Sequence, residues 1–381
     1  MTPDFLHPAC KKTVRTLLDD LVSARIENDF PMLKVVPFPK YPLDGTEITK
    51  IEGVKVAPTA KYWTVSSVDP TPKQQRRPRK TYLMATLNVT PDSFSDGAQY
   101  NTLPTALAYA TSAVASAADI IDIGGCSTRP RADFVSPEEE LRRIVPVIQA
   151  IRAHADDAVR DILVSVDTFR WDVAEQAVRA GANCINDVYA FTGPTYPPDA
   201  TSAEHLAKMR RVARDLGVPV VLMHSRGEAS ANKDYNAYPG GLVSAIQTEL
   251  GRKVDAIVRG PGAVRRWLVF VDPGIGFSKP VQGQMALMRD LGRVTADEAG
   301  NVLAGYPLLF GPSKKSVLGA VLEEPDMDGT YKGRKTTGQE RGWATAAAVA
   351  CAVQQGANVV RVHDVAEMKD VVAIASAIWT R

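Results

Sequence analysis

The sequence predicts an α/β fold, a (β/α)8 TIM barrel with an N-terminal appendage. Two observations predict it. Short apolar segments alternate with segments of helical period from residue 81 onward, and a polar or glycine-rich stretch follows each apolar segment. Eight buried strands alternating with helices over about 300 residues are the plan of such a barrel. A doubly wound open sheet is the alternative, but it rarely needs eight strands, and no Gly-x-Gly-x-x-Gly turn follows the first strand.

Composition narrows the classes of protein that fit. The 381 residues suit one large barrel plus an appendage, and a net charge of +2 argues against nucleic-acid or membrane-surface binding. No run of about 18 apolar residues predicts a membrane span. The four cysteines are far apart and lack metal-type spacing, which suits a reduced intracellular protein of the cytoplasm or mitochondrion, without a zinc site.

Residues 1–80 differ from the rest and are expected to form a separate segment, with the barrel at 81–381. Apolar residues at helical spacing predict a helix within 11–26, and short strands could pair within 47–57. The basic run at 73–80 is interpreted as a solvated linker, although it could also bind an acidic partner.

The barrel elements follow in order. The predicted strands are 82–89, 118–124, 161–167, 182–187, 218–223, 267–272, 306–311 and 357–362. Helical period is found at 102–117, 136–155, 169–180, 202–216, 241–259, 338–355 and 365–379, and a further helix is expected after 311–316.

The first strand delivers one amide, Asn88, to a rim. The turn-forming residues 90–97 after it contain one aromatic residue, Phe94. A buried strand that leads into such a loop suggests a mobile lid over a site, and an ordinary surface loop is the alternative.

Polar residues follow all eight strands, at the end where barrel enzymes place their chemistry. One aspartate at such a position often only caps the next helix. Eight polar strand ends that converge on one mouth are hard to explain as caps, so we expect a functional site there.

The strand-end residues fall into two chemical groups. Asp167, Asn186, Asp272 and Lys315 suit the hydrogen-bonding edge of a flat, nitrogen-rich heterocycle. A buried cation needs a partner, so Lys315 is expected beside Asp272 or Asp167, unless that pair is a structural ion pair that braces the barrel.

The second group consists of Arg129, Arg361 and His363, with Asn88 near them. Guanidinium and imidazolium groups hold phosphate oxygens, and an amide oxygen can help to hold Mg²⁺. His224 has no comparable partner in the sequence and is interpreted as structural.

The segment 311–316 joins the seventh strand to a helix. Ser313 and the backbone N–H groups after it would bind an anion, either a carboxylate or a phosphate. The Gly-x-x-x-x-Gly-Lys pattern is missing, which argues against ATP.

Seven motifs in order resemble those of dihydropteroate synthase. They are 88–97 (NVTPDSFSDG), 127–130 (STRP), 166–168 (VDT), 185–187 (IND), 272–274 (DPG), 313–316 (SKKS) and 361–363 (RVH). The resemblance covers residues 81–381. It implies a transferase that joins 6-hydroxymethyl-7,8-dihydropterin pyrophosphate to p-aminobenzoate, releases pyrophosphate in folate biosynthesis, and is inhibited competitively by sulfonamides.

The chain departs from the bacterial pattern at a few positions, of which Cys126 and the Gly-Pro-Ser form at 311–313 resemble fungal members. Cys126 and Arg131 flank the STRP motif, and Lys314 precedes Lys315. Residues 4–8 (DFLHP) and those after them resemble the C-terminal end of a 6-hydroxymethyl-dihydropterin pyrophosphokinase, which precedes the synthase in fungal multifunctional proteins. The kinase core is missing, so no kinase activity is predicted.

The resemblance also implies roles for individual residues. The catalytic set is Asn88, Asp92, Phe94, Arg129, Lys315, Arg361 and His363. The pterin is held by Asp167, Asn186, Met223, Asp272 and Lys315. The pyrophosphate is held by Asn88, Arg129, Arg361 and His363, with Asn88 also a ligand of Mg²⁺. The p-aminobenzoate pocket is formed by Phe94, Thr128, Pro130, Phe277 and Ser313, with Lys315 beside them.

The implied mechanism is dissociative. Pyrophosphate leaves with the help of Mg²⁺, a pterin methylene cation remains, and the arylamine attacks it after two loops, 90–100 and 126–135, have closed. A homodimer is expected through the alanine-rich segment 343–353, and packing of that segment on its own barrel is the alternative. A pterin-binding methyltransferase and a non-catalytic scaffold are the competing functions.

Overall fold

The computed structural model describes residues 50–51, 54–55, 80–90, 102–126, 134–227, 238 and 240–379. The predicted helix at 11–26 and the segments 91–101 and 127–133 lie outside these residues. Within the N-terminal segment, β1 (Lys50–Ile51) and β2 (Val54–Lys55) pair antiparallel, as the sequence predicted for that stretch.

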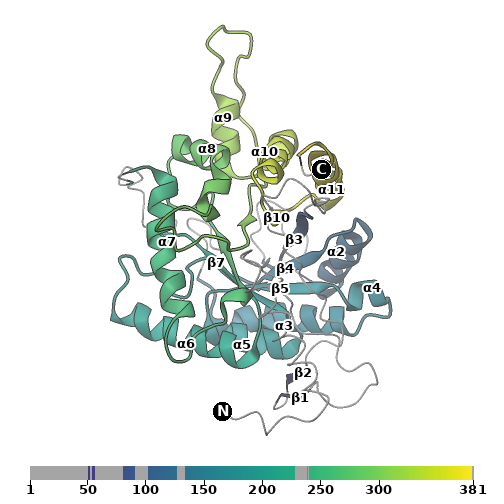
Figure 1. Ribbon diagram of the computed structural model, residues 1–381. Coiled ribbons are helices and arrows are strands. Elements are labelled where there is room, and N and C mark those ends of the chain that lie inside the picture. Colours follow the sequence, from purple (N-terminus) through teal and green to yellow (C-terminus); the bar gives the residue numbers. More distant parts are fainter. Residues whose placement is uncertain are drawn as a thin grey trace, which may run out of the picture.

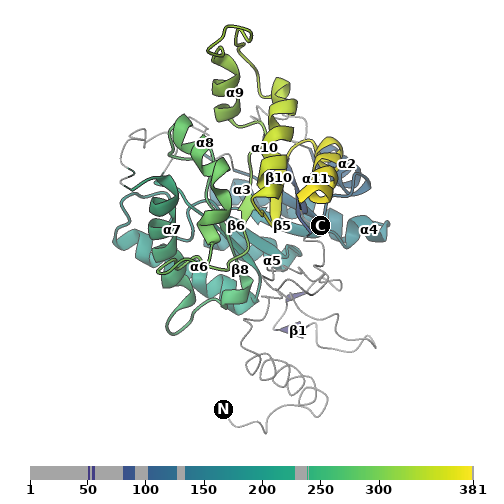
Figure 2. The same ribbon diagram turned by 45° about the horizontal axis from the view of Figure 1, so that its top comes forward.

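Eight parallel strands form the barrel in Figures 1 and 2. In the order of the sheet they run β8-β7-β6-β5-β4-β3-β10-β9. The sheet closes where the backbone nitrogen of Val271 donates to the carbonyl of Pro307 at 2.9 Å, with a parallel bridge between Val271 and Leu308. The strands are β3 (Tyr82–Asn88), β4 (Ile120–Gly124), β5 (Leu163–Asp167), β6 (Cys184–Asp187), β7 (Val220–Met223), β8 (Val269–Asp272), β9 (Leu309–Phe310) and β10 (Val359–Val362). All eight predicted strands are confirmed.

Helices surround the strands. They are α2 (Leu103–Ala115), α3 (Pro137–Arg152), α4 (Asp157–Arg160), α5 (Trp171–Ala180), α6 (Ala200–Leu216), α7 (Leu242–Val258), α8 (Val281–Arg289), α9 (Ser316–Glu323), α10 (Gly342–Gln354) and α11 (Val365–Trp379). The predicted helices are confirmed, except that α10 begins at Gly342, after a 3₁₀ turn (Gln339–Arg341). None of the helices in the described part of the chain has the length and apolarity to cross a bilayer.

Side-chain alternation along the strands divides the barrel into two layers of residues. Every second residue packs outward against the helices, and the residues between them point into the barrel. The inward residues toward the amino ends of the strands form their own apolar cluster: Tyr82, Met84, Ile120, Leu163, Cys184, Val221, Phe270, Leu309 and Val359. Two residues further along six of the strands, the same inward direction carries a polar side chain: Thr86, Asp122, Ser165, Asn186, Asp272 and Arg361. On β7 it carries Met223, and after β9 it falls on Gly311.

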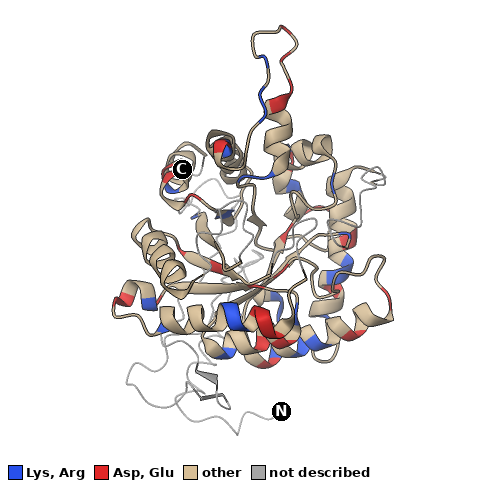
Figure 3. Cartoon of the chain, turned by 180° about the vertical axis from the view of Figure 1, so that it is seen from behind, with Lys and Arg blue, Asp and Glu red and all other residues tan. Residues whose placement is uncertain are grey.

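The eight barrel strands carry five charged residues, Asp122, Asp167, Asp187, Asp272 and Arg361. Figure 3 shows that charged residues otherwise lie mainly on the surrounding helices and loops. Asp187 alternates to the outer side, where its carboxylate accepts from the backbone nitrogens of Tyr189 and Phe191 at 2.7 and 3.0 Å and shapes the turn after β6. The other four point inward, toward the carboxyl ends of the strands.

Candidate active site

The centre of the site is an ion-pair network that joins three strands. Arg361 on β10 donates from Nε to Oδ2 of Asp122 on β4 at 2.6 Å, and from Nη2 to Oδ2 of Asp167 on β5 at 2.9 Å. The Asp122 side chain is fully buried, whereas Arg361 and Asp167 are each 19% exposed. Burial alone would lower the pKa of Arg361, but the two carboxylates outweigh it and raise that pKa.

Of two further predicted pterin ligands, Asn186 is bonded into this network, and Asp272 lies within electrostatic reach of Arg361. Nδ2 of Asn186 donates to Oδ2 of Asp122 at 3.0 Å, and Oδ1 of Asp272 accepts from the backbone nitrogen of Gly274 at 2.7 Å. Burial raises the pKa of Asp272 to about 6, although the Gly274 N–H and Lys315 oppose the shift. Burial also raises the pKa of Asp167, against the nearby charge of Arg361. Carboxylates whose pKa values are raised by burial beside a specific charged partner indicate a candidate functional site.

Lys315 stands at the rim, at the start of α9. Its Nζ lies 4.6 Å from the centre of the Phe277 ring, a cation–π contact. Its charge also opposes the rise that burial causes in the pKa values of Asp272 and Asp167. Lys315 therefore lies within electrostatic reach of both carboxylates named as its possible partners. Which of the two it pairs with stays a prediction.

Ser313 and His363 meet at the rim, although the sequence assigns them to different substrates. The Ser313 hydroxyl accepts from the backbone nitrogen of His363 at 3.2 Å and lies 2.9 Å from its ring Nδ1. Lys314 reinforces the junction, because its Nζ pairs with Asp364 at 2.7 Å. The loop after β9 and the end of β10 are therefore joined.

An apolar wall borders the polar floor. Met223 packs with Val188 and Tyr189, and Phe169 and Phe277 pack against that cluster. His224, the next residue, alternates to the outside of the barrel, where its Nε2 lies 3.1 Å from Glu249. Burial lowers the pKa of His224 to about 3, so it is neutral, which agrees with its interpretation as a structural residue.

Asn88 ends β3 beside this floor. It pairs in register with Gly124, which in turn pairs with Asp167. A Cβ atom at Gly124 would lie 3.8 Å from Oδ1 of Asn88 and 3.5 Å from Cβ of Asp167, so the glycine keeps the space between the two side chains open.

Five of the predicted site residues lie outside the described residues, and their roles stay predictions. They are Asp92, Phe94, Thr128, Arg129 and Pro130. All five belong to the two segments that the sequence predicts to be mobile lids.

The sequence interpretation missed two residues of the site. Asp122 could have been found, because it is the one charge in the apolar strand β4 and lies two residues before Gly124, on the inward side. Lys279 gives no such signal. Its buried Nζ donates to the carbonyls of Gly274, Phe277 and His224 at 2.7, 2.9 and 3.2 Å, and so braces the loop after β8.

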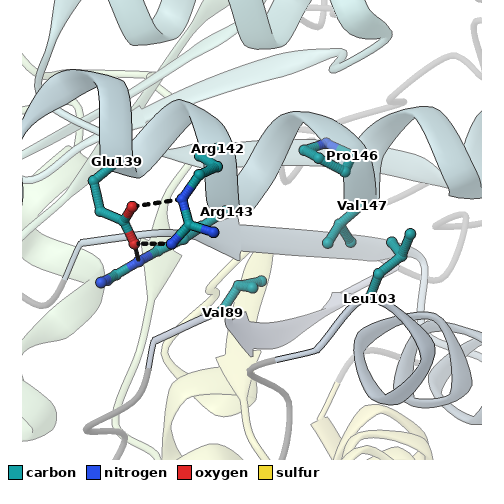
Figure 4. Close-up of a pocket in the computed structure, with 7 residues that line it drawn as sticks. All are labelled: Val89, Leu103, Glu139, Arg142, Arg143, Pro146 and Val147. Carbon is teal, nitrogen blue, oxygen red and sulfur yellow. Dashed lines mark hydrogen bonds and ion pairs between the residues drawn. The ribbon is translucent and has the colours of Figure 1, made fainter.

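A cavity of about 280 Å³ lies elsewhere, between α2, α3 and the end of β3. Figure 4 shows its apolar side, which includes Val89 and Leu103, and its polar side, where Arg142 and Arg143 both face Glu139. Both guanidinium groups bond to that carboxylate at 2.7 Å. The cavity has no group from the inward strand ends, so we place the site at the barrel mouth instead.

Known proteins resemble the chain along the whole barrel. The family model described as "Pterin binding enzyme" matches residues 84–363. The dihydropteroate synthase of Synechocystis sp. is 39% identical over 303 residues, which cover 79% of this chain and 91% of that protein. A folate synthesis bifunctional protein of Arabidopsis thaliana is 34% identical over 80% of this chain, but the match spans only 58% of the plant protein.

Solved structures agree with these relatives. The dihydropteroate synthase of Clostridium difficile, solved in the presence of pteroic acid, has a TM-score of 0.63 and 31% identity, covering 81% of this chain and all of that one. The Yersinia pestis dihydropteroate synthase, solved in complex with a sulfonamide drug, has a TM-score of 0.63 and 33% identity, covering 78% and 94%. The chain therefore belongs to the dihydropteroate synthase family of pterin-binding enzymes.

Proposed function

We propose that this dihydropteroate synthase binds 6-hydroxymethyl-7,8-dihydropterin pyrophosphate on the barrel floor and p-aminobenzoate at the rim. The products are 7,8-dihydropteroate and pyrophosphate. The observation that carries this assignment is the network of Arg361 with Asp122 and Asp167, which lies beside Asn186 and Asp272 at the carboxyl ends of the strands. The pteroic acid and sulfonamide in the two similar structures support the same ligand classes.

The floor suits the donor-rich edge of a pterin. Asp167 and Asp272 supply carboxylate acceptors, Asn186 supplies an amide and Lys315 supplies a donor, while Met223 offers an apolar surface to a flat ring. When ionised, the carboxylates of Asp167 and Asp272 would stabilise positive charge on a bound heterocycle.

The anion side is proposed to consist of Asn88, Arg129, Arg361 and His363. A guanidinium group has five N–H donors, and the contacts of Arg361 with Asp122 and Asp167 use two of them. Within the part of the chain that the structure describes, the other three donors make no hydrogen bond and would be left for pyrophosphate oxygens. Arg361 would therefore stand between the two halves of one substrate.

Mg²⁺ is proposed as the cofactor, and the residues fit it. Within the described ranges, no group of three or more His, Cys, Asp or Glu residues could cage a metal ion. Mg²⁺ commonly keeps several waters and takes one or two protein oxygens plus substrate phosphates. Asn88 offers one amide oxygen at the strand end, which suits an ion that arrives with pyrophosphate. When bound, Mg²⁺ would neutralise negative charge on the leaving group.

The proposed reaction is dissociative. The bond between the pterin methylene carbon and the pyrophosphate oxygen breaks, and its electron pair leaves with the pyrophosphate. Arg361 and His363 stabilise that anion, while the carboxylates of Asp167 and Asp272 stabilise the cation that remains. The amine nitrogen of p-aminobenzoate then forms the new C–N bond and loses a proton. No protein nucleophile is required, and closure of 90–100 and 126–135 would exclude water.

Pyrophosphate release tests this function. The assay supplies the dihydropterin pyrophosphate and Mg²⁺, with and without p-aminobenzoate, and follows pteroate formation in parallel. Pteroate that appears in step with pyrophosphate supports the synthase reaction, and release without the amine supports the dissociative order. Folded protein that binds the pterin but forms neither product would contradict the proposal.

The N-terminal segment is proposed to be a remnant of a fungal-type pyrophosphokinase domain plus a linker. The support is the resemblance of residues 4–8 and the partial match to a bifunctional plant protein. In this proposal the natural protein is multifunctional. An assay of pyrophosphate transfer from ATP to 6-hydroxymethyl-dihydropterin should give no product with this chain, and measurable kinase turnover would refute the remnant interpretation.

Three further properties belong to the same proposal. Sulfonamides should compete with p-aminobenzoate, because both would use the rim at Ser313 and Lys315. The chain should form a homodimer through α10 and α11.

An intracellular location, cytoplasmic or mitochondrial, is supported by the free thiols of Cys126, Cys184 and Cys351. Organelle fractionation would test it.

A further inference from the structure

We infer that Asp122 is a positioning residue for pterin binding, which fixes the amide of Asn186 and the guanidinium group of Arg361 in the orientations that the ligand needs. The inference rests on the proposed function, and it adds a residue that neither the motifs nor the comparisons assign.

Asp122 lies one layer below the mouth of the barrel. In the register of the sheet it stands between Thr86 on β3 and Ser165 on β5, two residues below Gly124. Its side chain is 0% exposed. A carboxylate at this depth has no surface in the site and cannot serve as a surface contact for a ligand, so it can act only through the residues that it touches.

One oxygen of Asp122 holds both neighbours. Oδ2 accepts from Nε of Arg361 at 2.6 Å and from Nδ2 of Asn186 at 3.0 Å. The other oxygen, Oδ1, has no hydrogen-bond partner among the described residues. A buried carboxylate is costly unless it is paired, so the contacts at Oδ2 are the interactions that keep this charge in the barrel.

The direction of these bonds sets the chemistry that Asn186 presents. An ionised carboxylate can only accept, so the NH₂ group of Asn186 must face Asp122. The carbonyl oxygen Oδ1 of the amide then faces away from Asp122 and is available as an acceptor. Asp167, Asp272 and Asn186 together form an acceptor set for the N–H groups of a pterin. Without Asp122 the amide could turn around and present a donor instead.

Arg361 is restrained in a similar way. Its Nε is held by Asp122 on one side and its Nη2 by Asp167 on the other, which fixes the plane of the guanidinium group. If Asp122 is removed, the contact with Asp167 alone allows that plane to rotate. The remaining N–H donors would then lose their fixed direction toward the anion.

Calorimetry of 6-hydroxymethylpterin binding tests the inference. This probe lacks the pyrophosphate, so its affinity reports on the pterin floor and not on the anion side. Asp122→Ala removes the acceptor. We expect the Kd of this variant for the probe to be at least tenfold higher than that of the wild type, a loss of about 1.4 kcal/mol in binding free energy. Asp122→Asn keeps an oxygen that can accept from both neighbours, and its affinity should lie between those of Asp122→Ala and the wild type. It also keeps the test valid if the alanine variant does not fold.

Thr86→Val is the matched control. Thr86 is equally buried, pairs in register with Asp122, and its hydroxyl has no partner among the described residues. Its Kd for the probe should stay within twofold of the wild type. If Asp122 served only to stabilise the fold, the folded Asp122 variants would bind as the control does, and that result would overturn the inference.

A double-mutant cycle with Asn186→Ala separates positioning from independent effects. Because Asp122 acts partly through Asn186, its substitution should cost less affinity in the Asn186→Ala background than in the wild type. Fully additive losses in both this cycle and a parallel one with Arg361→Ala would overturn the inference. In turnover assays, the KM for the pterin substrate should rise while that for p-aminobenzoate changes little.

Measurements on the wild-type chain separate a failure of the proposed function from a failure of the inference about Asp122. Wild-type protein that binds 6-hydroxymethylpterin and forms pteroate upholds the proposed function whatever the Asp122 variants do. Folded wild-type protein that does not bind the probe would overturn the proposed function and this inference together.

Discussion

The hydroxyl of Ser313 lies 2.9 Å from Nδ1 of His363. This contact joins the residue proposed for the carboxylate of p-aminobenzoate to the residue proposed for pyrophosphate. If the hydroxyl hydrogen points at Nδ1, the ring carries its proton on Nε2, where it can donate to a leaving oxygen. The second substrate and the first product would therefore meet the same pair of side chains.

Ser313→Ala should impair both steps. We expect the KM for p-aminobenzoate to rise and pyrophosphate release without the amine to slow, because His363 loses the contact that orients its ring. Each loss should be about tenfold, the scale of a hydrogen bond to a charged or oriented group. Rapid-quench measurement of pyrophosphate, with Ser313→Thr as the variant that keeps a hydroxyl, would check this. A change in the KM for p-aminobenzoate alone would show that the contact has no role in pyrophosphate release.

Pterin affinity should fall as the pH falls through about 6. Burial raises the pKa of Asp272 to about 6, and a pterin that donates to the carboxylate prefers its ionised form. The folded-state pKa is above that of the unfolded chain, so ionisation of Asp272 costs the unliganded protein stability as the pH rises through about 6. The ligand should offset that cost. Calorimetry from pH 5 to 8 should detect proton release on binding near pH 6, and Asp272→Asn should remove the part due to Asp272. Any acid limb that is left would belong to Asp167, whose pKa burial also raises, and an unchanged limb would contradict the assignment to Asp272.

Arg361→Ala should reduce both stability and pyrophosphate binding. The substitution leaves Asp122 and Asp167 as neighbouring carboxylates in the barrel without their shared cation, a loss of about 3 kcal/mol in the free energy of unfolding. Chemical denaturation measures that loss, and competition by free pyrophosphate measures the anion site. Arg361→Lys keeps the charge but not the fork, so it should recover stability more than pyrophosphate affinity. Unchanged pyrophosphate affinity in Arg361→Ala would remove Arg361 from the anion site.

Gly274→Ala should disturb the loop that orients Asp272. Gly274 has a φ of +70°, and a Cβ atom there would lie 2.1 Å from the carbonyl oxygen of His224. We expect a loss of about 2–3 kcal/mol in the free energy of unfolding, with weakened pterin binding. Gly300→Ala is the control, since its φ is +83° but no atom lies within 4 Å of the added carbon, and it should cost about 1 kcal/mol. Equal losses in the two variants would rule out the steric explanation.

Trp343→Glu should break the proposed dimer. Trp343 on α10 is 90% exposed, and Ile374 and Ile378 on the adjoining helix α11 are 64% and 61% exposed. Exposed large apolar side chains on two adjoining helices are typical of an interaction site when they form one patch. Sedimentation should give about twice the 41.2 kDa chain mass for the wild type and the single mass for Trp343→Glu. Trp267→Glu, which alters an exposed tryptophan of the 3₁₀ helix Arg266–Leu268, should leave the dimer intact. A monomeric wild type would contradict the proposal.

Much of the fold was predictable because its signals are local. The predicted strands are short apolar runs bounded by turn formers, and the predicted helices have an apolar face, so both can be recognised within a short window. The helices α4 and α8 were not predicted. Alternation along β4 and β5 even decides which residues point inward. The shortening of β9 to Leu309–Phe310 and the late start of α10 were not predictable, because hydrogen bonds to neighbouring strands and turns set those boundaries.

The sequence by itself determined the barrel, the polar strand ends and the chemical types of residue that gather there. Only the tertiary structure decided which of them touch. Asp122 and Arg361 are 239 residues apart, and Ser313 and His363 are 50 apart, so closure of the barrel creates both contacts. Lys279 holds three carbonyls in a loop whose path depends on packing between β7 and β8. Long-range pairs of this kind depend on the spatial order of the strands, and local residue patterns contain no such information.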